Sequence, residues 1–251
     1  MNRLEGKRIV LTGGAGGIGL PLAQLLDDLG AHVTNVDRLR CPAAHVNWLT
    51  DLGDDIALTQ LARTLAAETP DMLINLAGVL AFGLHEKQDP AQLALCYRIN
   101  LLVPAVLAQA VAGPMRARGS GQIVNVGSVL GAIPYPWFAA YSSSKAGLAA
   151  LSQALRRELD GSGVTVTHIA PRAARTAFNN SLVNRFLTVA GMTADSPDHV
   201  AARIAEAIRS GAAHVTVGRM EGLFSLINAI APRMIDRGIA PQLRRLRAEF
   251  S

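Results

Sequence analysis

The sequence predicts a single-domain, doubly wound α/β fold, in which a parallel sheet carries helices on both faces. Short β-branched runs alternate along the chain with longer runs rich in Ala, Leu and Arg, which is the pattern of repeated strand–helix–strand units. A glycine-rich turn follows the first of the β-branched runs. The 251 residues suit one large domain, and no Ser/Gly linker, charge block or short repeat divides them. We therefore expect residues 1–251 to form one domain.

Each element follows from its local composition. Strands are expected where β-branched residues cluster between turn residues, in chain order at residues 7–12, 32–36, 72–75, 122–126, 164–169 and 213–217. Helices are expected in the longer intervals at residues 20–29, 54–68, 92–112, 145–159 and 197–210. The uncharged stretch 99–115 contains two prolines and is shorter than the roughly 20 apolar residues of a membrane span, so a buried helix is favoured there.

Composition excludes several classes of protein. Charged residues make up 17% of the chain, below the roughly 25% of an average soluble protein, which excludes disorder. The net charge is +5, but the basic residues are dispersed and only 4% of residues are aromatic, so no nucleic-acid partner is expected. Cys41 and Cys96 are isolated, and the histidines form no ligand pair, so neither a disulfide scaffold nor a metal site is predicted. With a polar N-terminus, the sequence indicates a cytoplasmic protein.

The glycine-rich turn has the context of a phosphate-binding loop. It reads Gly13-Gly14-Ala15-Gly16-Gly17-Ile18-Gly19, after a predicted strand and before a predicted helix. Glycines let the backbone turn sharply and approach a pyrophosphate, whose charge then lies at the helix N-terminus. No Lys-Ser/Thr pair follows Gly19, which excludes a P-loop nucleotidase. The loop therefore predicts a Rossmann-type dinucleotide site.

Asp37 indicates which dinucleotide is preferred. It ends the second predicted strand, 18 residues after Gly19. A carboxylate there accepts hydrogen bonds from the adenosine ribose and repels a 2′-phosphate, which favours NAD. Arg38 and Arg40 follow directly and leave NADP possible. The alternative reading of Asp37 is a turn residue.

Tyr141 and Lys145 form the clearest catalytic pattern. They are four residues apart at the start of a predicted helix and so share one face. A neighbouring cation favours the phenolate, so we expect the pKa of Tyr141 to fall towards neutrality and the side chain to act as an acid or base. Ser128 lies thirteen residues upstream.

Together these motifs resemble the short-chain dehydrogenase/reductase family, in its single-domain branch of about 250 residues, from Thr12 to Thr176. Thr12-Gly13 with Gly17-Ile18-Gly19 looks like the cofactor loop of the family, and Tyr141 and Lys145 look like its catalytic pair. The resemblance implies that further cofactor contacts come from Asp51, Leu52, Asn75, Ala77, Gly78, Pro171 and Thr176.

The resemblance also implies catalytic roles. Ser128 would bind the substrate oxygen, and Tyr141 would exchange a proton with it. Lys145 would hold the nicotinamide ribose and lower the pKa of Tyr141, while Asn100 would hold a water that links Lys145 to solvent. Taken singly, Ser128 could be a turn residue and Asn100 a helix cap. A serine hydrolase is excluded, since Val126 stands where that motif has glycine two residues before the serine.

Two departures from the family pattern stand out. Arg172 follows Pro171 where the family has glycine; we expect it either to bind a substrate anion or carrier phosphate or to pair with a nearby carboxylate. Residues 222–251 form an atypical basic, amphipathic segment, which could contact a membrane or an acyl carrier, or pack near the substrate cleft or a neighbouring subunit. A homodimer through residues 92–112 and 145–159 is preferred, and a tetramer is less certain.

The predicted substrate is lipophilic. Apolar side chains crowd residues 129–140 beside the catalytic pair and residues 178–192 after Thr176. Apolar walls favour an acyl-chain, polyketide-like or steroid-like carbonyl or alcohol, although ordinary core packing would give the same pattern. The predicted function is NAD(P)-dependent oxidation or reduction of a hydrophobic secondary alcohol or ketone. The alternatives are a catalytically silent nucleotide sensor or scaffold, and a lipid reductase at a membrane surface.

Overall fold

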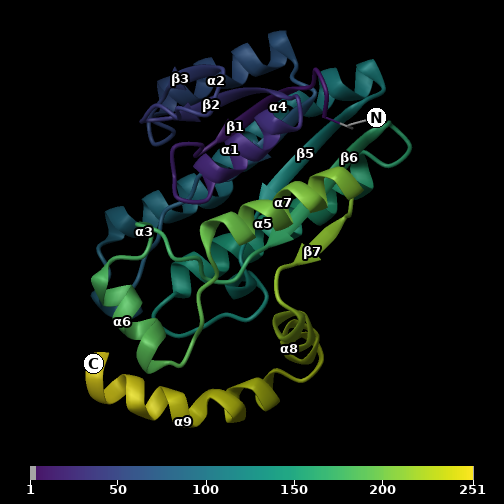
Figure 1. Ribbon diagram of the computed structural model, residues 1–251. Coiled ribbons are helices and arrows are strands. Elements are labelled where there is room, and N and C mark those ends of the chain that lie inside the picture. Colours follow the sequence, from purple (N-terminus) through teal and green to yellow (C-terminus); the bar gives the residue numbers. More distant parts are fainter. Residues whose placement is uncertain (1–3, 251) are drawn as a thin grey trace.

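The predicted α/β fold is confirmed by a parallel seven-stranded sheet of order β3-β2-β1-β4-β5-β6-β7 in the computed structural model, which describes residues 4–250 (Figure 1). Residues 1–3 and Ser251, which the predicted domain includes, lie outside the described residues. The strands are β1 (Arg8–Thr12), β2 (His32–Asp37), β3 (Val46–Leu49), β4 (Met72–Asn75), β5 (Gly121–Val126), β6 (Val164–Ala170) and β7 (His214–Thr216). The strand order reverses between β1 and β4, which is where doubly wound sheets bind ligands.

Sequence patterning missed one strand, β3. It is a short edge strand, and Val46 and Leu49 on it are exposed, so it lacks the buried β-branched run by which the others were predicted. Asn47 holds it in place, because its Oδ1 accepts hydrogen bonds from the Asn35 amide at 2.9 Å and the Cys41 backbone N–H at 2.7 Å. The strand forms through these polar contacts rather than through apolar periodicity.

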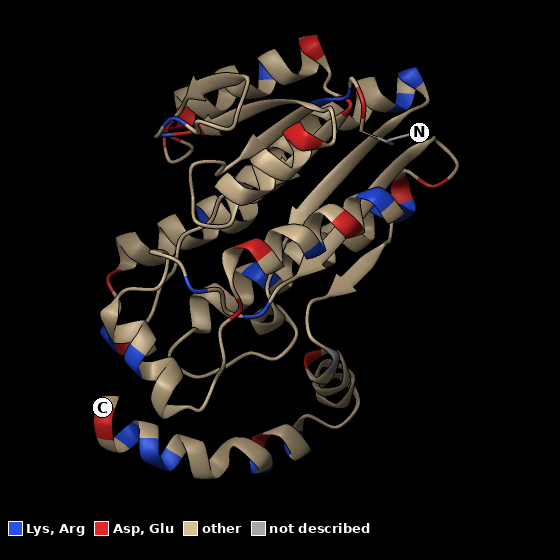
Figure 2. Ribbon diagram, viewed as in Figure 1, with Lys and Arg blue, Asp and Glu red and all other residues tan. Residues whose placement is uncertain are grey.

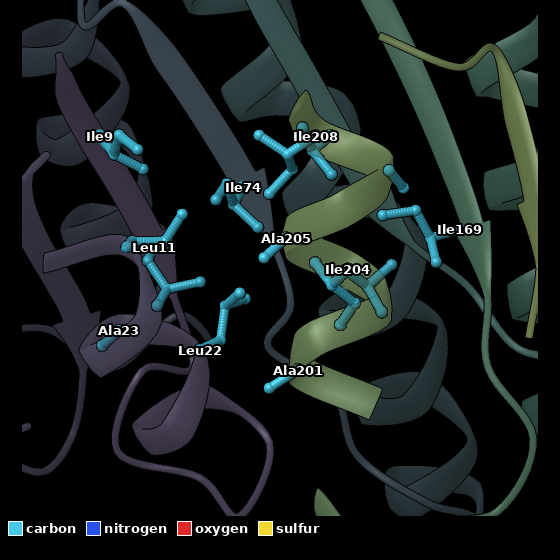
Figure 3. Close-up of a cluster of buried hydrophobic side chains, with 14 of the residues drawn as sticks. Ile9, Leu11, Leu22, Ala23, Ile74, Ile169, Ala201, Ile204, Ala205 and Ile208 are labelled. Atoms are coloured by element: carbon cyan, nitrogen blue, oxygen red, sulfur yellow. The ribbon is translucent and has the colours of Figure 1, made fainter. Parts of the chain in front are cut away.

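Helices cover both faces of the sheet, as predicted. The helices are α1 (Gly19–Asp28), α2 (Asp55–Glu68), α3 (Pro90–Tyr97), α4 (Val103–Arg118), α5 (Ala139–Glu158), α6 (Ser181–Val189), α7 (Pro197–Ser210), α8 (Arg219–Ile230) and α9 (Pro232–Phe250). Helices α1 and α7 pack on one face, where Leu22 and Ile204 meet β1, β4 and β6 side chains such as Leu11, Ile74 and Ile169 (Figure 3). Helices α2 and α4 pack on the other face, with Leu65 and Leu107 in its core.

The helix predicted at residues 92–112 is longer and contains a π-turn. It runs continuously from Pro90 to Arg118, and its middle turn, η2 (Arg98–Leu102), is a π-helix. By length and composition alone this helix could cross a membrane. However, Leu107, Val111 and Met115 are fully buried against α2 and the sheet, so it is a core helix, as expected. Single π-turns often occur at functional sites, and this one carries Asn100.

The C-terminal segment forms helices that lie beyond the carboxyl ends of the strands. Figure 1 shows α6, α8 and α9 gathered at this end of the molecule, away from the N-terminus. Leu246 of α9 is fully buried, in a cluster with Phe186 of α6 and the aromatic side chains of the loop before α5. Packing against the rest of the chain, near the predicted substrate cleft, was one of the alternatives for the C-terminal segment, and it is the one that the structure shows within a single chain.

Candidate active site

The glycine loop after β1 is held against the segment after β4. The Thr12 hydroxyl accepts hydrogen bonds from the backbone N–H groups of Leu76 and Ala77, both at 3.1 Å. Gly13 has φ +77°, and a Cβ there would lie 2.8 Å from the Ala77 backbone. No other residue type fits at this crossing without displacing the backbone.

The same loop also packs against the segment after β6. A Cβ on Gly17 would lie 2.5 Å from the Thr176 side chain, and one on Gly19 would lie 2.1 Å from the Gly13 carbonyl oxygen. Helix α1 begins at Gly19, with no acidic residue in its first turn and no side-chain cap among the described residues. A bare backbone loop in front of an uncapped helix N-terminus fits a pyrophosphate, so the residues present fit a dinucleotide.

Asp37 lies at the rim of this site and also supports the loop. Its Oδ2 accepts a hydrogen bond from the Ala15 N–H and its Oδ1 accepts one from the Leu39 N–H, both at 3.2 Å. The turn-residue interpretation and the ribose-acceptor interpretation are therefore compatible. Arg38 and Asp51 are exposed at the same end of the cavity, next to the buried Leu52.

The four predicted catalytic residues come together at the carboxyl end of β5. Ser128 follows β5, and its hydroxyl accepts a hydrogen bond from the Leu130 N–H at 3.2 Å. Tyr141 and Lys145 lie on one face of α5, with the Lys145 ammonium 5.9 Å from the centre of the tyrosine ring. The ammonium donates a hydrogen bond to the Val126 carbonyl at 2.9 Å. Ser128, Tyr141 and Lys145 all line one cavity.

The pKa values of this pair correct one expectation. Burial raises the pKa of Tyr141 to about 12, and the hydrogen bond with Ser128 lowers it only in part. Burial also lowers the pKa of Lys145 to about 8. The sequence analysis expected the lysine to bring the tyrosine pKa towards neutrality. Removal of the phenol from water is the largest cause of the shift, so the phenol is protonated at neutral pH.

Asn100 is buried and its amide clamps two segments together. Its Oδ1 accepts a hydrogen bond from the Val79 N–H at 2.9 Å, and its Nδ2 donates to the Val79 carbonyl at 2.9 Å and to the Ser144 hydroxyl at 3.1 Å. Asn100 is therefore not a helix cap; it joins the π-turn to the segment after β4. Sequence reasoning missed Ser144, although it directly precedes Lys145 on α5.

Asn75 requires a second correction. It was grouped with the cofactor-binding residues, but its side chain is buried in the sheet, where its Nδ2 donates to Asn125 Oδ1 at 2.8 Å. Asn125 in turn donates to the Ser152 hydroxyl of α5 at 2.9 Å. Of the described residues of this segment, Ala77 and Gly78 line the cavity whereas Asn75 does not. Asn75 acts by joining β4 to β5 and, through Asn125, to α5.

The cavity has a volume of about 1140 Å³, above the usual range for a small-molecule pocket and suited to a dinucleotide together with a substrate. One end is formed by the glycine loop, Asp37, Asp51, Pro171 and Thr176. The other end is apolar, with walls from the loop before α5, from α6 and from α8 and α9: Leu130, Ile133, Tyr135, Phe138, Val183, Leu187, Phe224, Ile227 and Ile239.

The apolar segments predicted to surround the substrate divide between cavity and core. Phe138 and Leu187 line the cavity. Trp137 and Phe186 instead pack on each other, with ring centres 5.3 Å apart, in a buried aromatic cluster. Helices α8 and α9 also line the cavity, which agrees with the alternative in which the C-terminal segment packs near the substrate cleft.

Arg172 is paired with carboxylates, the second of its two expected environments. Its guanidinium donates to both oxygens of Asp195, at 2.8 and 2.6 Å, and to Glu221 Oε1 of α8 at 3.3 Å. This Arg172 cluster (Arg172, Asp195 and Glu221) connects the segment after β6 to the loop before α7 and to α8. The guanidinium lowers the pKa of the Asp195 carboxyl, which keeps the ion pair charged at neutral pH.

Comparison with known proteins gives consistent matches. Residues 7–185 match the family model for the short chain dehydrogenases. The chain is 28% identical over 270 residues to the ketoacyl reductase HetN of Nostoc sp. strain PCC 7120, which covers 94% of this chain and 89% of that protein. It is 30% identical over 229 residues to the 3-oxoacyl-(acyl-carrier-protein) reductase FabG of Vibrio cholerae, which covers 85% of this chain and 94% of that protein.

A solved structure is similar over most of its length. It is a Beutenbergia cavernae protein provisionally assigned as an NAD(P)-dependent gluconate 5-dehydrogenase, with NADP bound at low occupancy. The TM-score is 0.77 with 27% identity, and the match covers 86% of this chain and 96% of that one.

The buried ammonium predicts a pH-dependent effect of Lys145→Met. The pKa of Lys145 is about 8 when folded against 10.5 normally, so the unfolded chain binds more protons between these values. The variant should therefore be more stable than the wild type below pH 8, by about 1–3 kcal/mol. This difference in free energy of unfolding should become smaller as the pH rises towards 10.5. Urea unfolding of both proteins across this pH range measures the difference. A difference that does not change with pH would contradict a buried Lys145 ammonium with a lowered pKa.

Removing the Arg172 guanidinium should loosen α8. Arg172→Ala leaves Asp195 and Glu221 without their shared cation and should lower the free energy of unfolding by about 1–2 kcal/mol. Since α8 forms part of the apolar end of the cavity, KM for a lipophilic substrate should rise more than kcat falls. Arg203→Ala, which breaks an exposed ion pair with Glu206 on α7, is the matched control and should change little. Equal effects of the two substitutions would contradict the role of the cluster.

Proposed function

The chain belongs to the short-chain dehydrogenase family and is an NAD(P)-dependent oxidoreductase, and we propose that it reduces a lipophilic ketone to a secondary alcohol. The observation that carries the proposal is the position of Tyr141. It lines the cavity between the glycine loop at one end and the apolar walls at the other. A proton donor at that junction can meet the carbonyl oxygen of a substrate whose apolar part fills the far end.

Each residue at the junction has a separate role in the proposed reaction. Ser128 holds the substrate oxygen beside the phenol, and Tyr141 donates its proton to that oxygen. Lys145, from the same face of α5, supplies a positive charge that stabilises the tyrosinate formed. Pro171 and Thr176, which line the cavity, would hold a nicotinamide, and that group would supply the hydride when bound. The pKa of Tyr141, raised by burial to about 12, keeps the phenol protonated at neutral pH, which is the form that donates a proton to a ketone oxygen.

An acyl-chain or polyketide-like carbonyl is the proposed substrate class. The apolar end of the cavity has few polar groups to orient a polyol, and its walls come from four separate segments. Two relatives carry names of the same kind, a ketoacyl reductase and a 3-oxoacyl-(acyl-carrier-protein) reductase. Both observations support this class over a sugar.

NAD is the proposed cofactor, on the strength of Asp37 at the adenosine end of the cavity. A homodimer in the cytoplasm is proposed as well. The exposed side chains of Tyr97 and Leu102, on the helix from Pro90 to Arg118, support a subunit contact there. The buried free thiols of Cys41 and Cys96 support a reducing compartment. A monomeric mass by light scattering would exclude the dimer.

Asp37→Asn should relax cofactor choice. The amide keeps an oxygen acceptor for one of the Ala15 and Leu39 N–H groups and removes the charge that repels a 2′-phosphate. NADPH affinity should rise about tenfold relative to NADH, which is about 1.4 kcal/mol. Calorimetric titration measures both. Asp51→Asn, at an exposed carboxylate of the same end whose Oδ1 accepts from the Gly53 N–H at 2.8 Å, is the control. If the wild type already prefers NADPH, the proposal for NAD is wrong.

Tyr141→Phe tests the reaction itself. Loss of the acidic hydroxyl should lower kcat for a medium-chain 3-oxoacyl thioester by about 10²–10⁴-fold and leave cofactor affinity nearly unchanged. Cofactor oxidation followed by absorbance, beside a cofactor titration, gives both values. Substantial turnover by the variant would show that another group transfers the proton.

A further inference from the structure

Helix α8 turns two polar side chains towards the rest of the chain and leaves most of its large apolar side chains exposed. On the inner side, Glu221 pairs with Arg172 at 3.3 Å and the Asn228 amide donates to the Ala132 carbonyl at 2.9 Å. On the outer side, the exposed fractions are 49% for Leu223, 57% for Leu226 and 76% for Ile230. Met220, also on α8, is 55% exposed. A helix on a water-facing surface normally has the opposite polarity.

These four side chains define the outer apolar face: Met220, Leu223, Leu226 and Ile230. Polar contacts on the inner side hold α8 in this orientation, so the exposure is a property of the folded chain. Clustered exposed side chains of this size indicate an interaction surface.

Helix α9 supplies positive charge next to this face. Figure 2 shows blue, basic segments along α9. In the sequence these are Arg233, Arg237, Arg244, Arg245 and Arg247, while residues 222–230 of α8 contain no charged residue. The acids of α8 and α9 are Glu221, Asp236 and Glu249. Of these, Glu221 is paired with Arg172 and Glu249 with Arg185. The segment therefore presents an uncharged stretch of α8, residues 222–230, beside a cationic helix.

We propose that the outer apolar face and the arginines of α9 dock on an anionic lipid surface. Apolar side chains that enter the boundary of a bilayer, next to cations that attract its headgroups, are the two components of interfacial binding. A second copy of this chain would cover the apolar face but would bring the same positive charge to it. An acidic carrier protein would match the arginines but leave the apolar face of α8 in water.

The inner side of α8 connects this surface to the cavity. Phe224 and Ile227 of α8 and Met234 at the start of α9 line the cavity, so its apolar end adjoins the outer apolar face. A protein docked in this way takes a lipophilic substrate from the lipid phase. That last step rests on the proposed function, whereas the docking does not.

Flotation with phosphatidylcholine vesicles, with and without phosphatidylglycerol, tests the docking on the full chain saturated with cofactor. The wild type should bind the anionic vesicles, and binding should fall as salt is added. Leu226→Ser with Ile230→Ser should weaken binding about tenfold or more, because two large apolar side chains no longer enter the boundary. Arg233→Gln with Arg237→Gln should remove the preference for anionic vesicles.

The control is Ile56→Ser with Arg63→Gln on α2, a matched apolar and basic pair in which Ile56 is 69% exposed; it should bind as the wild type does. Equal binding by the Leu226/Ile230 variant, or no wild-type binding to anionic vesicles, overturns the proposal. A smaller mass for that variant by light scattering, without vesicle binding by the wild type, assigns the face to a second copy. Binding only to an acidic acyl-carrier protein assigns it to that partner. All these experiments measure binding, so their outcome does not depend on whether the proposed enzymatic activity is correct.

Discussion

The site depends on how closely the backbone after β1 approaches its neighbours. At Gly13 the chain crosses Ala77 with no room for a side chain, and at Gly17 it packs against Thr176. The Thr12 hydroxyl fixes the first of these crossings by accepting two backbone hydrogen bonds from the segment after β4. Because the segments after β1, β4 and β6 are joined here, α1 points its uncapped N-terminus at the surface they share, and an anion placed there meets backbone N–H groups.

Burial at the other end of the cavity sets the protonation of the catalytic pair. Keeping a lysine ammonium away from water costs free energy, which the hydrogen bond to the Val126 carbonyl only partly offsets. The Asn75–Asn125–Ser152 chain and the Asn100 amide hold α5 and the π-turn in place around that charge. These hydrogen-bonded side chains keep Lys145 and Tyr141 buried, and burial is what shifts their pKa values. Without such support, water would enter around the buried charge.

The sequence located the motifs but not their environments. Strand and helix periodicity predicted most of the strands and helices. The functional residues were found because they form motifs of short spacing: the glycine loop with Asp37, and Ser128 with Tyr141 and Lys145. The pKa of Tyr141 was predicted in the wrong direction because burial cannot be read from a pair of residues. The partners of Arg172 lie 23 and 49 positions away, and only folding brings them together. The orientation of α8 was equally hidden, since it is set by the contacts of Glu221 and Asn228.

Binding of a nicotinamide dinucleotide to the wild type and to Gly17→Val tests the central claim most directly. A valine at this position meets Thr176 and fills the space in front of α1, so calorimetry should show one site in the wild type and none in the variant. Matching circular dichroism spectra and melting curves without ligand would show that the variant is folded. Binding of NADH or NADPH to both proteins alike, or to neither, would contradict the account.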